Sequence, residues 1–146
     1  MDTKLEAELI RKYPRIFKLA QEANFKDWDK SHGRWPFSLF GIECDNGWYD
    51  LLDRLCEKVE ACINRAEDPD IYYVVQIKEK FGGLRFYMSS HTVEFHCLIR
   101  EAEKESEITC EICGRPGILG ENKWNWYQTL CQECRTKKDA ELDKEF

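Results

Sequence analysis

Several features that mark enzymes and membrane proteins are missing from this sequence. It contains no G-x-S-x-G elbow, no HExxH motif and no glycine-rich loop that could cradle a phosphate, so common signatures of hydrolases, metalloproteases and nucleotide-binding enzymes are absent. No apolar run approaches the roughly 20 residues that cross a bilayer, and the acidic N-terminal stretch does not resemble a secretory signal. We therefore expect a cytoplasmic protein that is not an enzyme and has no membrane partner.

An excess of positive charge is also lacking. The chain has 22 Lys and Arg against 28 Asp and Glu, a net charge of −6, and residues 109–146 contain six basic and seven acidic side chains. Proteins that bind DNA or RNA diffusely normally show a basic footprint. The charge balance therefore disfavours a nucleic-acid partner, although a local basic patch stays open.

Cysteine, by contrast, is abundant, with eight in 146 residues. Cys110, Cys113, Cys131 and Cys134 form a C-x2-C-x17-C-x2-C frame, which is the spacing of a four-cysteine zinc site. Four thiolates close the tetrahedron and leave no position for a substrate, so we predict one structural Zn²⁺, while iron accepts the same ligands. Buried thiols or a redox pair is the alternative, but a thioredoxin-type site needs one CxxC at a strand-to-helix junction.

The other four cysteines match no ligand frame with the three histidines. Cys62 falls on the apolar stripe of a predicted helix and Cys56 borders it, so packing is the predicted role. His96 and Cys97 are adjacent on a predicted helix and point about 100° apart, which argues against a nucleophile and base. A role beyond packing stays open for these thiols, which are Cys44, Cys56, Cys62 and Cys97.

Helical periodicity predicts three main helices. Thr3 begins a capping-box pattern, and Pro14 should end or restart that first helix. Apolar residues recur at helical spacing from Trp48 to Ala66, for about five turns. A third helix is predicted from a Thr92 cap to about Ser106. The aromatic-rich stretch from Trp28 to Phe40 is expected to be an irregular loop across the core.

The segment from Ile71 to Met88 predicts a β-hairpin that turns at Gly82-Gly83, and its core face is expected to hold Ile71, Tyr73, Val75 and Ile77. This register places Lys80 opposite Arg85. Because like charges directly opposite destabilise a sheet, the pairing predicts an acidic neighbour or an anionic partner. The outer face is a candidate binding surface, with a solvated face as the alternative; its residues include Lys78, Lys80, Arg85 and Tyr87.

Two tryptophans lie between the cysteine pairs. Trp124 to Leu130 is predicted to be a short strand, and alternation would place Trp124 and Trp126 on one face. That face is a candidate aromatic contact surface, and packing against the metal loop or the main domain is the alternative. A charged helix is expected after Cys131.

The run VQIKEKFGGLRFY from Val75 to Tyr87, followed by CEICGRPG and TLCQEC, resembles a family of small uncharacterised bacterial and bacteriophage proteins. The sequence GWYD from Gly47 to Asp50 also fits that pattern, and the resemblance covers roughly residues 40–135. It implies a bacterial or viral cytoplasmic setting. It carries no established activity, so it transfers no catalytic residue.

These observations predict an α+β fold in which helices pack on a β-hairpin. Residues 1–108 would form the core domain, and residues 109–146 a zinc-ribbon-like module continuous with it. The favoured function is zinc-stabilised binding of a protein partner, extended by analogy to a phage or prophage inhibitor of a host factor or defence complex. The alternative is a nucleic-acid-binding regulator that uses the hairpin's basic face and the module. The oligomeric state is not predicted.

Overall fold

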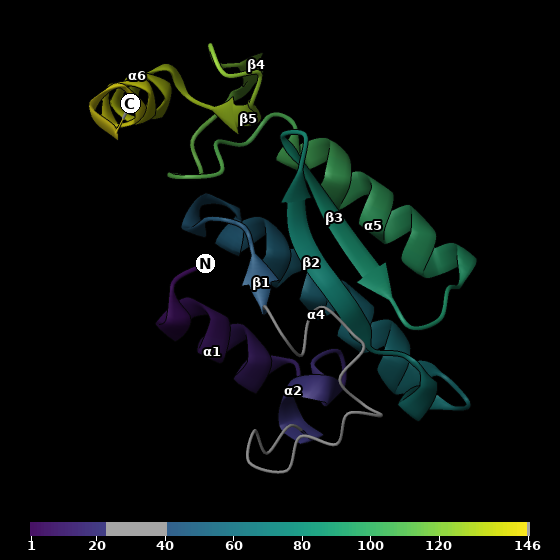
Figure 1. Cartoon of the computed structure of the whole chain (residues 1–146). Helices are drawn as coiled ribbons and strands as arrows, with labels where there is room; N and C mark the ends of the chain where they lie inside the picture. The colour runs from purple at the N-terminus through teal and green to yellow at the C-terminus, as the bar shows by residue number, and fades with distance from the viewer. Residues whose placement is uncertain (23–40, 146) are drawn as a thin grey trace.

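The computed structural model describes residues 1–22 and 41–145, and the aromatic loop predicted from Trp28 to Phe40 lies outside the described residues. Helices and strands are both present, as an α+β fold requires (Figure 1). In chain order the elements are α1 (Thr3–Lys12), α2 (Lys18–Glu22), β1 (Ile42–Glu43), η1 (Asn46–Trp48), α4 (Tyr49–Arg65), η2 (Pro69–Ile71), β2 (Val74–Lys80), β3 (Gly83–Met88), α5 (Val93–Ser106), β4 (Ile118–Glu121), β5 (Tyr127–Leu130) and α6 (Gln132–Glu145).

The three predicted helices are confirmed as α1, α4 and α5, with one cap moved by a residue. Thr92 caps α5, because its hydroxyl accepts a hydrogen bond from the amide of Phe95 at 3.1 Å. At α1 the cap is Asp2 and not Thr3, since the Asp2 carboxylate accepts from the amide of Lys4 at 2.8 Å. Thr3 is instead the first helical residue.

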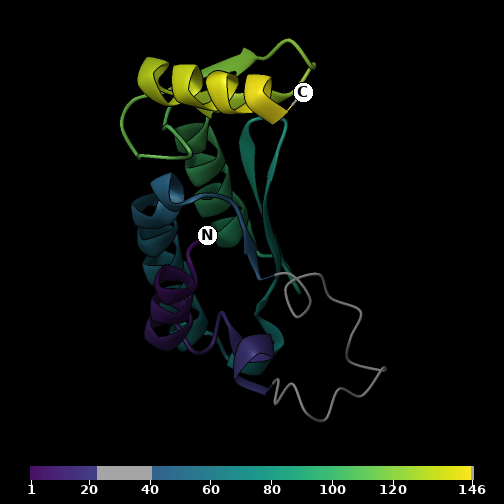
Figure 2. The ribbon, with the colours of Figure 1, turned by 60° about the vertical axis from the view of Figure 1, so that its left-hand side comes forward.

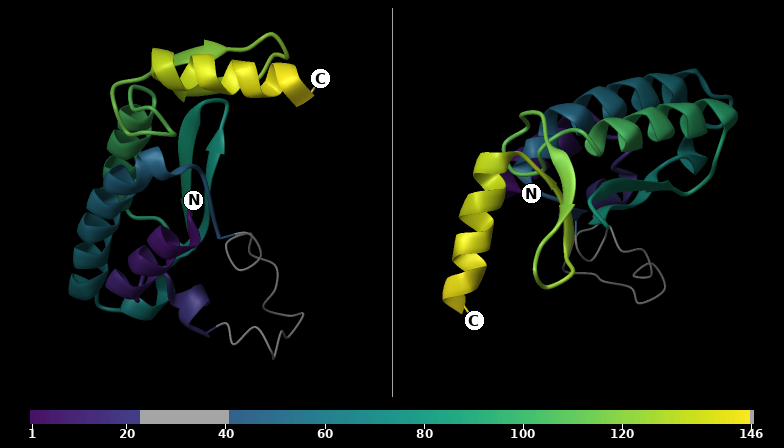
Figure 3. Two further views of the ribbon diagram at one scale, coloured as in Figure 1. Left: turned by 90° about the vertical axis from the view of Figure 1, so that its left-hand side faces the viewer. Right: turned by 90° about the horizontal axis from the view of Figure 1, so that it is seen from above.

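The main core lies between α4, α5 and a three-stranded sheet of order β1-β2-β3. Helices α4 and α5 run side by side over one face of the sheet (Figure 3, right). The apolar stripe of α4 is buried along its length, and Trp48, Phe17, Phe86 and Phe95 are among the largest buried side chains. No helix in the described part of the chain is long and apolar enough to cross a membrane.

The predicted hairpin is confirmed, but its register differs by two residues. Lys80 pairs with Gly83, so the turn residues are Phe81 and Gly82, with φ of 53° and 81°. A two-residue turn of this kind requires positive φ at both positions, and Phe81 takes the place where the prediction put glycine. The residue opposite Arg85 is therefore Lys78, and the predicted pairing of Lys80 with Arg85 is wrong.

The core face of this hairpin also departs from simple alternation. Ile77 is buried as predicted, but a register shift between Val74 and Gln76 buries both Val74 and Val75. Ile71, predicted to face the core, is exposed because it lies in η2, before the strand begins. Alternation holds only after the bulge.

A second sheet pairs β4 with β5, and α6 lies alongside it across one end of the molecule (Figure 2). The Arg135 side chain of α6 donates to the carbonyl oxygens of Ile118 at 2.8 Å and Gln128 at 3.0 Å. A Cβ atom at position 120 would lie 2.8–3.0 Å from atoms of the Arg135 guanidinium, which is too close. Glycine at position 120 therefore makes room for the contact that holds α6 on the hairpin.

Candidate metal centre

The structure brings the four cysteines of the sequence frame together. Their sulfur atoms all lie within 4.8 Å of one another, and the Sγ atoms of Cys113 and Cys131 are 3.7 Å apart. A tetrahedron with metal–sulfur bonds of about 2.3 Å has edges of about 3.8 Å. Four convergent thiols at this spacing could hold a structural metal ion.

Each pair of cysteines is held by its own turn. In the first turn, the amide of Gly114, at φ 79°, donates to the Cys110 carbonyl at 2.9 Å. In the second, the amide of Cys134 points at the Cys131 sulfur at 3.4 Å and lowers the pKa of that thiol. Backbone N–H groups aimed at sulfur stabilise thiolates, which are the form that binds metal.

Arg115 lies against the exposed side of the cluster. Its Nε donates to the Cys113 sulfur at 3.3 Å, and its Nη2 lies 3.7 Å from the Cys131 sulfur and 2.9 Å from a Glu133 oxygen. This guanidinium lowers the pKa of Cys113 to about 6. Four thiolates around a divalent ion carry net negative charge, and Arg115 offsets part of it. The cysteine spacing alone does not single out Arg115.

The first cysteine turn is fixed to the start of α4. The buried Trp48 indole donates to the carbonyl of Thr109 at 2.9 Å, and the amide of Gly47 donates to the Glu111 carbonyl at 2.6 Å. A Cβ at Gly47 would overlap the carbonyl oxygens of Cys110 and Glu111. Gly47 and Trp48 therefore form a joint between the core and the cluster, a role that the sequence did not reveal.

Glu111 is buried in this joint between two ligands of the cluster. Only 3% of it is exposed; Oε1 accepts from the Asp45 amide at 3.2 Å, and Oε2 has no hydrogen-bond partner among the described residues. Burial raises its pKa to about 7. Sequence reasoning missed this residue, because a glutamate inside a CxxC pair has no pattern that distinguishes it from a surface side chain.

The predicted aromatic strand is shorter than expected. Trp124 and Trp126 lie in the turn between β4 and β5, where the Asn122 carboxamide accepts from both of their amides at 3.0 and 3.1 Å, and Asn125 has φ 61°. Strand alternation therefore does not apply to them. Both indoles are partly exposed, with Lys123 over the Trp124 ring and Lys138 over the Trp126 ring.

The predicted basic surface lies on a different sheet from the tryptophans. Lys78 and Arg85 face each other on the outer face of β2 and β3, and the parallel pairing of β1 places Glu43 beside Lys78. The prediction of an acidic neighbour was made for Lys80 opposite Arg85, a pairing that does not occur; the like-charge pair that does occur has Glu43 beside it. Lys80 and Tyr87 share this outer face, and Tyr87 is exposed.

The remaining cysteines do not join a second cluster within residues 1–22 and 41–145. Cys44 and Cys56 are buried and Cys62 is partly buried, in agreement with the predicted packing role. Cys97 is exposed on α5, so packing does not explain it. His32 lies outside the described residues.

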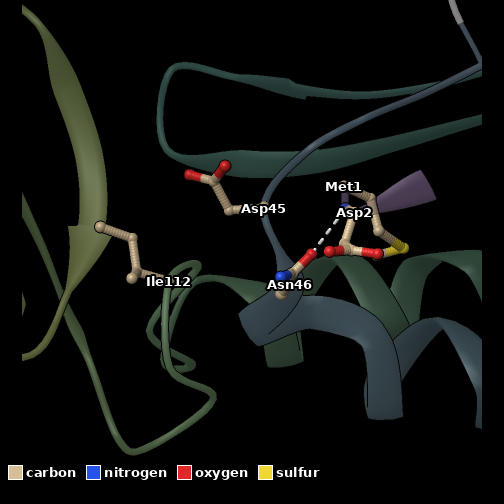
Figure 4. Close-up of a pocket in the computed structure, with 5 residues that line it drawn as sticks. All are labelled: Met1, Asp2, Asp45, Asn46 and Ile112. Carbon is tan, nitrogen blue, oxygen red and sulfur yellow. Dashed lines mark hydrogen bonds between the residues drawn. The ribbon is translucent and has the colours of Figure 1, made fainter. Parts of the chain in front are cut away.

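A hollow of about 500 Å³ lies where the N-terminus, the segment before α4 and the first cysteine turn meet. Figure 4 shows the side chains that line it, and the Asp2 amide donates to the Asn46 carboxamide across it at 2.7 Å. The described lining has no cysteine or histidine. Its residues are Met1, Asp2, Asp45, Asn46 and Ile112.

Comparison with family models, with curated proteins and with solved structures finds no match for the chain.

Proposed function

We propose that this protein is a zinc-stabilised module that binds a protein partner and has no catalytic activity. The four-cysteine cluster supports the metal, because thiolates in a closed tetrahedral set suit Zn²⁺ and leave no open coordination position. The small two-stranded sheet beside the cluster supports a zinc-ribbon-like architecture for residues 109–146. The metal's role is to hold this segment in shape.

The observation that carries the binding function is the position of the module's large apolar side chains. Its buried cluster contains only Cys110, Leu130 and Cys134. Contiguous exposed apolar surface on a soluble protein is typical of interaction sites. Five large apolar residues of the module are exposed, namely Ile118, Leu119, Trp124, Trp126 and Tyr127.

The resemblance to bacterial and bacteriophage proteins extends this proposal to the partner. In a phage setting, the partner would be a host factor or defence complex that the module binds and inhibits. Only the resemblance supports that step, and the affinity capture below tests it.

Affinity capture from bacterial lysate, followed by native mass spectrometry, tests the function. We expect one zinc ion per chain and a protein partner in stoichiometric amount. The matched control is the double variant Trp124→Ser with Trp126→Ser, which should keep its zinc and recover less partner. Failure to recover any stoichiometric protein with the wild type would refute the proposal.

Nucleic-acid binding is the second candidate, and the lysine side chains over both indoles favour it. An aromatic ring that stacks on a base beside a cation that contacts phosphate is a common single-strand site. This function predicts affinity for a single-stranded oligonucleotide that falls steeply with salt. The double variant Lys123→Glu with Lys138→Glu should abolish it, and unchanged affinity would exclude the tryptophan turn as the site.

A further inference from the structure

The four thiols of the metal centre differ in how far solvent reaches them. Cys110 is completely buried and only 8% of Cys134 is exposed, whereas Cys113 is exposed and Cys131 is partly exposed. Each CxxC turn therefore contributes one inner and one outer thiol. A small oxidant in solution meets the outer pair, Cys113 and Cys131, before it meets the inner pair, because thiol oxidation follows exposure.

The two outer thiols also lie against each other. Their sulfur atoms are 3.7 Å apart, although they belong to different turns and stand 18 positions apart in the sequence. A thiol that has been oxidised to a sulfenic acid forms a disulfide with a second thiol within reach. Oxidation of either outer thiol therefore finds its resolving partner at once, and the oxygen that leaves passes directly to solvent.

Arg115 places a guanidinium on the exposed side of this pair. Its Nε donates to the Cys113 sulfur at 3.3 Å and its Nη2 lies 3.7 Å from the Cys131 sulfur, while 57% of the side chain is exposed. When a thiolate attacks a peroxide, negative charge develops on the departing oxygen, and an adjacent donor stabilises it. Glu133 pairs with the same Nη2 at 2.9 Å, so the site suits an uncharged oxidant better than an anionic one.

We propose that the outer pair is a peroxide-sensitive switch, in which a hydroperoxide oxidises Cys113 and Cys131 to a disulfide and the module loses its metal. The inference rests on the zinc site of the proposed function and adds a signal that controls it. It does not depend on the identity of the partner.

The reaction needs one external reactant, the hydroperoxide. The Cys113 thiolate attacks the peroxide, the O–O bond breaks, and a sulfenic acid forms while the departing hydroxide takes up a proton to become water. The Cys131 thiolate then attacks the sulfenic sulfur, so that the S–S bond forms, the S–O bond breaks and a second hydroxide leaves as water. The two thiolates lose two electrons in total, which reduce one hydrogen peroxide to two molecules of water.

Formation of this disulfide removes two of the four ligands in one reaction. The inner pair, Cys110 and Cys134, does not close a tetrahedron, so the metal is lost. Cys134 lies in the first turn of α6, and metal loss therefore removes the bond that fixes this helix from inside the module. Since the metal is proposed to hold the binding surface in shape, we expect partner binding to fall as well.

Hydrogen peroxide added to the zinc-loaded full chain tests the switch. A chromophoric chelator follows zinc release, and mass spectrometry identifies the disulfide after alkylation of free thiols and proteolysis. We expect complete release of the bound zinc together with a Cys113–Cys131 disulfide, and recovery of zinc binding after reduction with a dithiol. A disulfide within either CxxC turn, or zinc retained while the exposed Cys97 is oxidised, would overturn the proposal.

Two histidine variants sharpen the test, since three thiolates and one imidazole also hold zinc. Cys113→His removes one thiol of the outer pair and should keep its zinc at a peroxide dose that empties the wild type. Cys134→His leaves the outer pair intact and should lose zinc as the wild type does. Cys97→Ser removes an exposed thiol outside the cluster and should leave zinc release unchanged.

The outcomes separate the switch from the function on which it rests. Equal zinc loss from Cys113→His and Cys134→His would contradict the switch, and if either variant fails to bind zinc, the disulfide map of the wild type decides. If the wild type binds zinc that peroxide does not release, only the switch fails. If the wild type binds no zinc, the proposed function fails together with it.

Discussion

The two parts of the chain differ in where their apolar side chains lie. Among the described residues, the core around α4, α5 and the first sheet buries 21 in one cluster, from Leu9 to Ala102. The apolar cluster of the cysteine module has three buried residues, and two of them are Cys110 and Cys134. The core is held by its own packing, whereas the module is too small to exclude water from a core of its own.

This difference shows what the module depends on. We expect metal–thiolate bonds to replace the missing core from inside, while contacts with the core hold the module from outside. Those contacts occur at two points, the Gly47–Trp48 joint and the Gly82–Thr129 hydrogen bond.

Removal of the metal should separate the two parts most strongly. In Cys113→Ser with Cys131→Ser, we expect the amides of β4 and β5 to lose hydrogen-exchange protection while those of α4 and β2 keep it. Structural zinc sites contribute on the order of 10 kcal/mol to the folding of small modules. The exposed Cys97→Ser serves as control and should leave exchange unchanged. Persistent protection of the β4 and β5 amides in the double variant would show that the Gly47–Trp48 joint keeps the module folded without the metal.

Gly47→Ala should disrupt the Gly47–Trp48 joint, through which the core holds the first cysteine turn. The new methyl group would overlap two backbone carbonyls of the first cysteine turn, which cannot move as a flexible side chain can. We expect a loss of about 2–3 kcal/mol in the free energy of unfolding by denaturant titration, as for overpacked sites. Gly83→Ala is the control, because its Cβ would meet the mobile end of Arg85 first. Equal effects of the two variants would contradict the importance of the joint.

Much of the fold follows from local pattern, and the misses are of two kinds. Apolar periodicity located α4 and α5, and the cysteine spacing identified four thiols that the structure brings together. The hairpin register was missed because Phe81 accepts a conformation that ordinarily needs glycine. The strand prediction for Trp124 and Trp126 failed because Asn122 folds that stretch into a turn.

The second kind of miss concerns contacts between distant parts of the chain. Gly47 and Glu111 are 64 positions apart, and nothing in the local sequence of either predicts their hydrogen bond. The two points of contact between core and module belong to this class. Local propensity determines elements, whereas the joint depends on backbone groups that have no side-chain signature.

Arg115→Ala should weaken the metal centre while leaving both parts folded. Loss of the guanidinium removes the hydrogen bonds to Cys113 and Cys131, and partners of this kind commonly change metal affinity by about 10- to 100-fold. Competition with a chromophoric chelator measures this affinity. Arg100→Ala, whose side chain pairs with Glu103 on α5, is the matched control. If the variant binds zinc as tightly as the wild type does, Arg115 forms the ion pair with Glu133 but does not support the metal centre.

Glu111→Gln should produce the smallest effect and test the joint through pH. Burial, helped by the nearby charges of Asp45 and Glu79, raises the pKa of Glu111 to about 7, while the hydrogen bond from the Asp45 amide and the charge of Lys138 oppose the rise. Because this folded-state pKa lies above the unfolded value, the carboxyl's contribution to stability is complete below about pH 4.5 and is lost as pH rises through 7.

Glutamine at position 111 keeps the acceptor for the Asp45 amide and does not titrate. Relative to the wild type, the variant should therefore gain about 1 kcal/mol in unfolding free energy between pH 6 and pH 8. Denaturant titrations of the zinc-loaded proteins at both pH values measure this difference in unfolding free energy. The titration of the cysteine thiols is common to the two proteins and therefore cancels. A constant difference would mean that Glu111 is charged in the joint at both pH values.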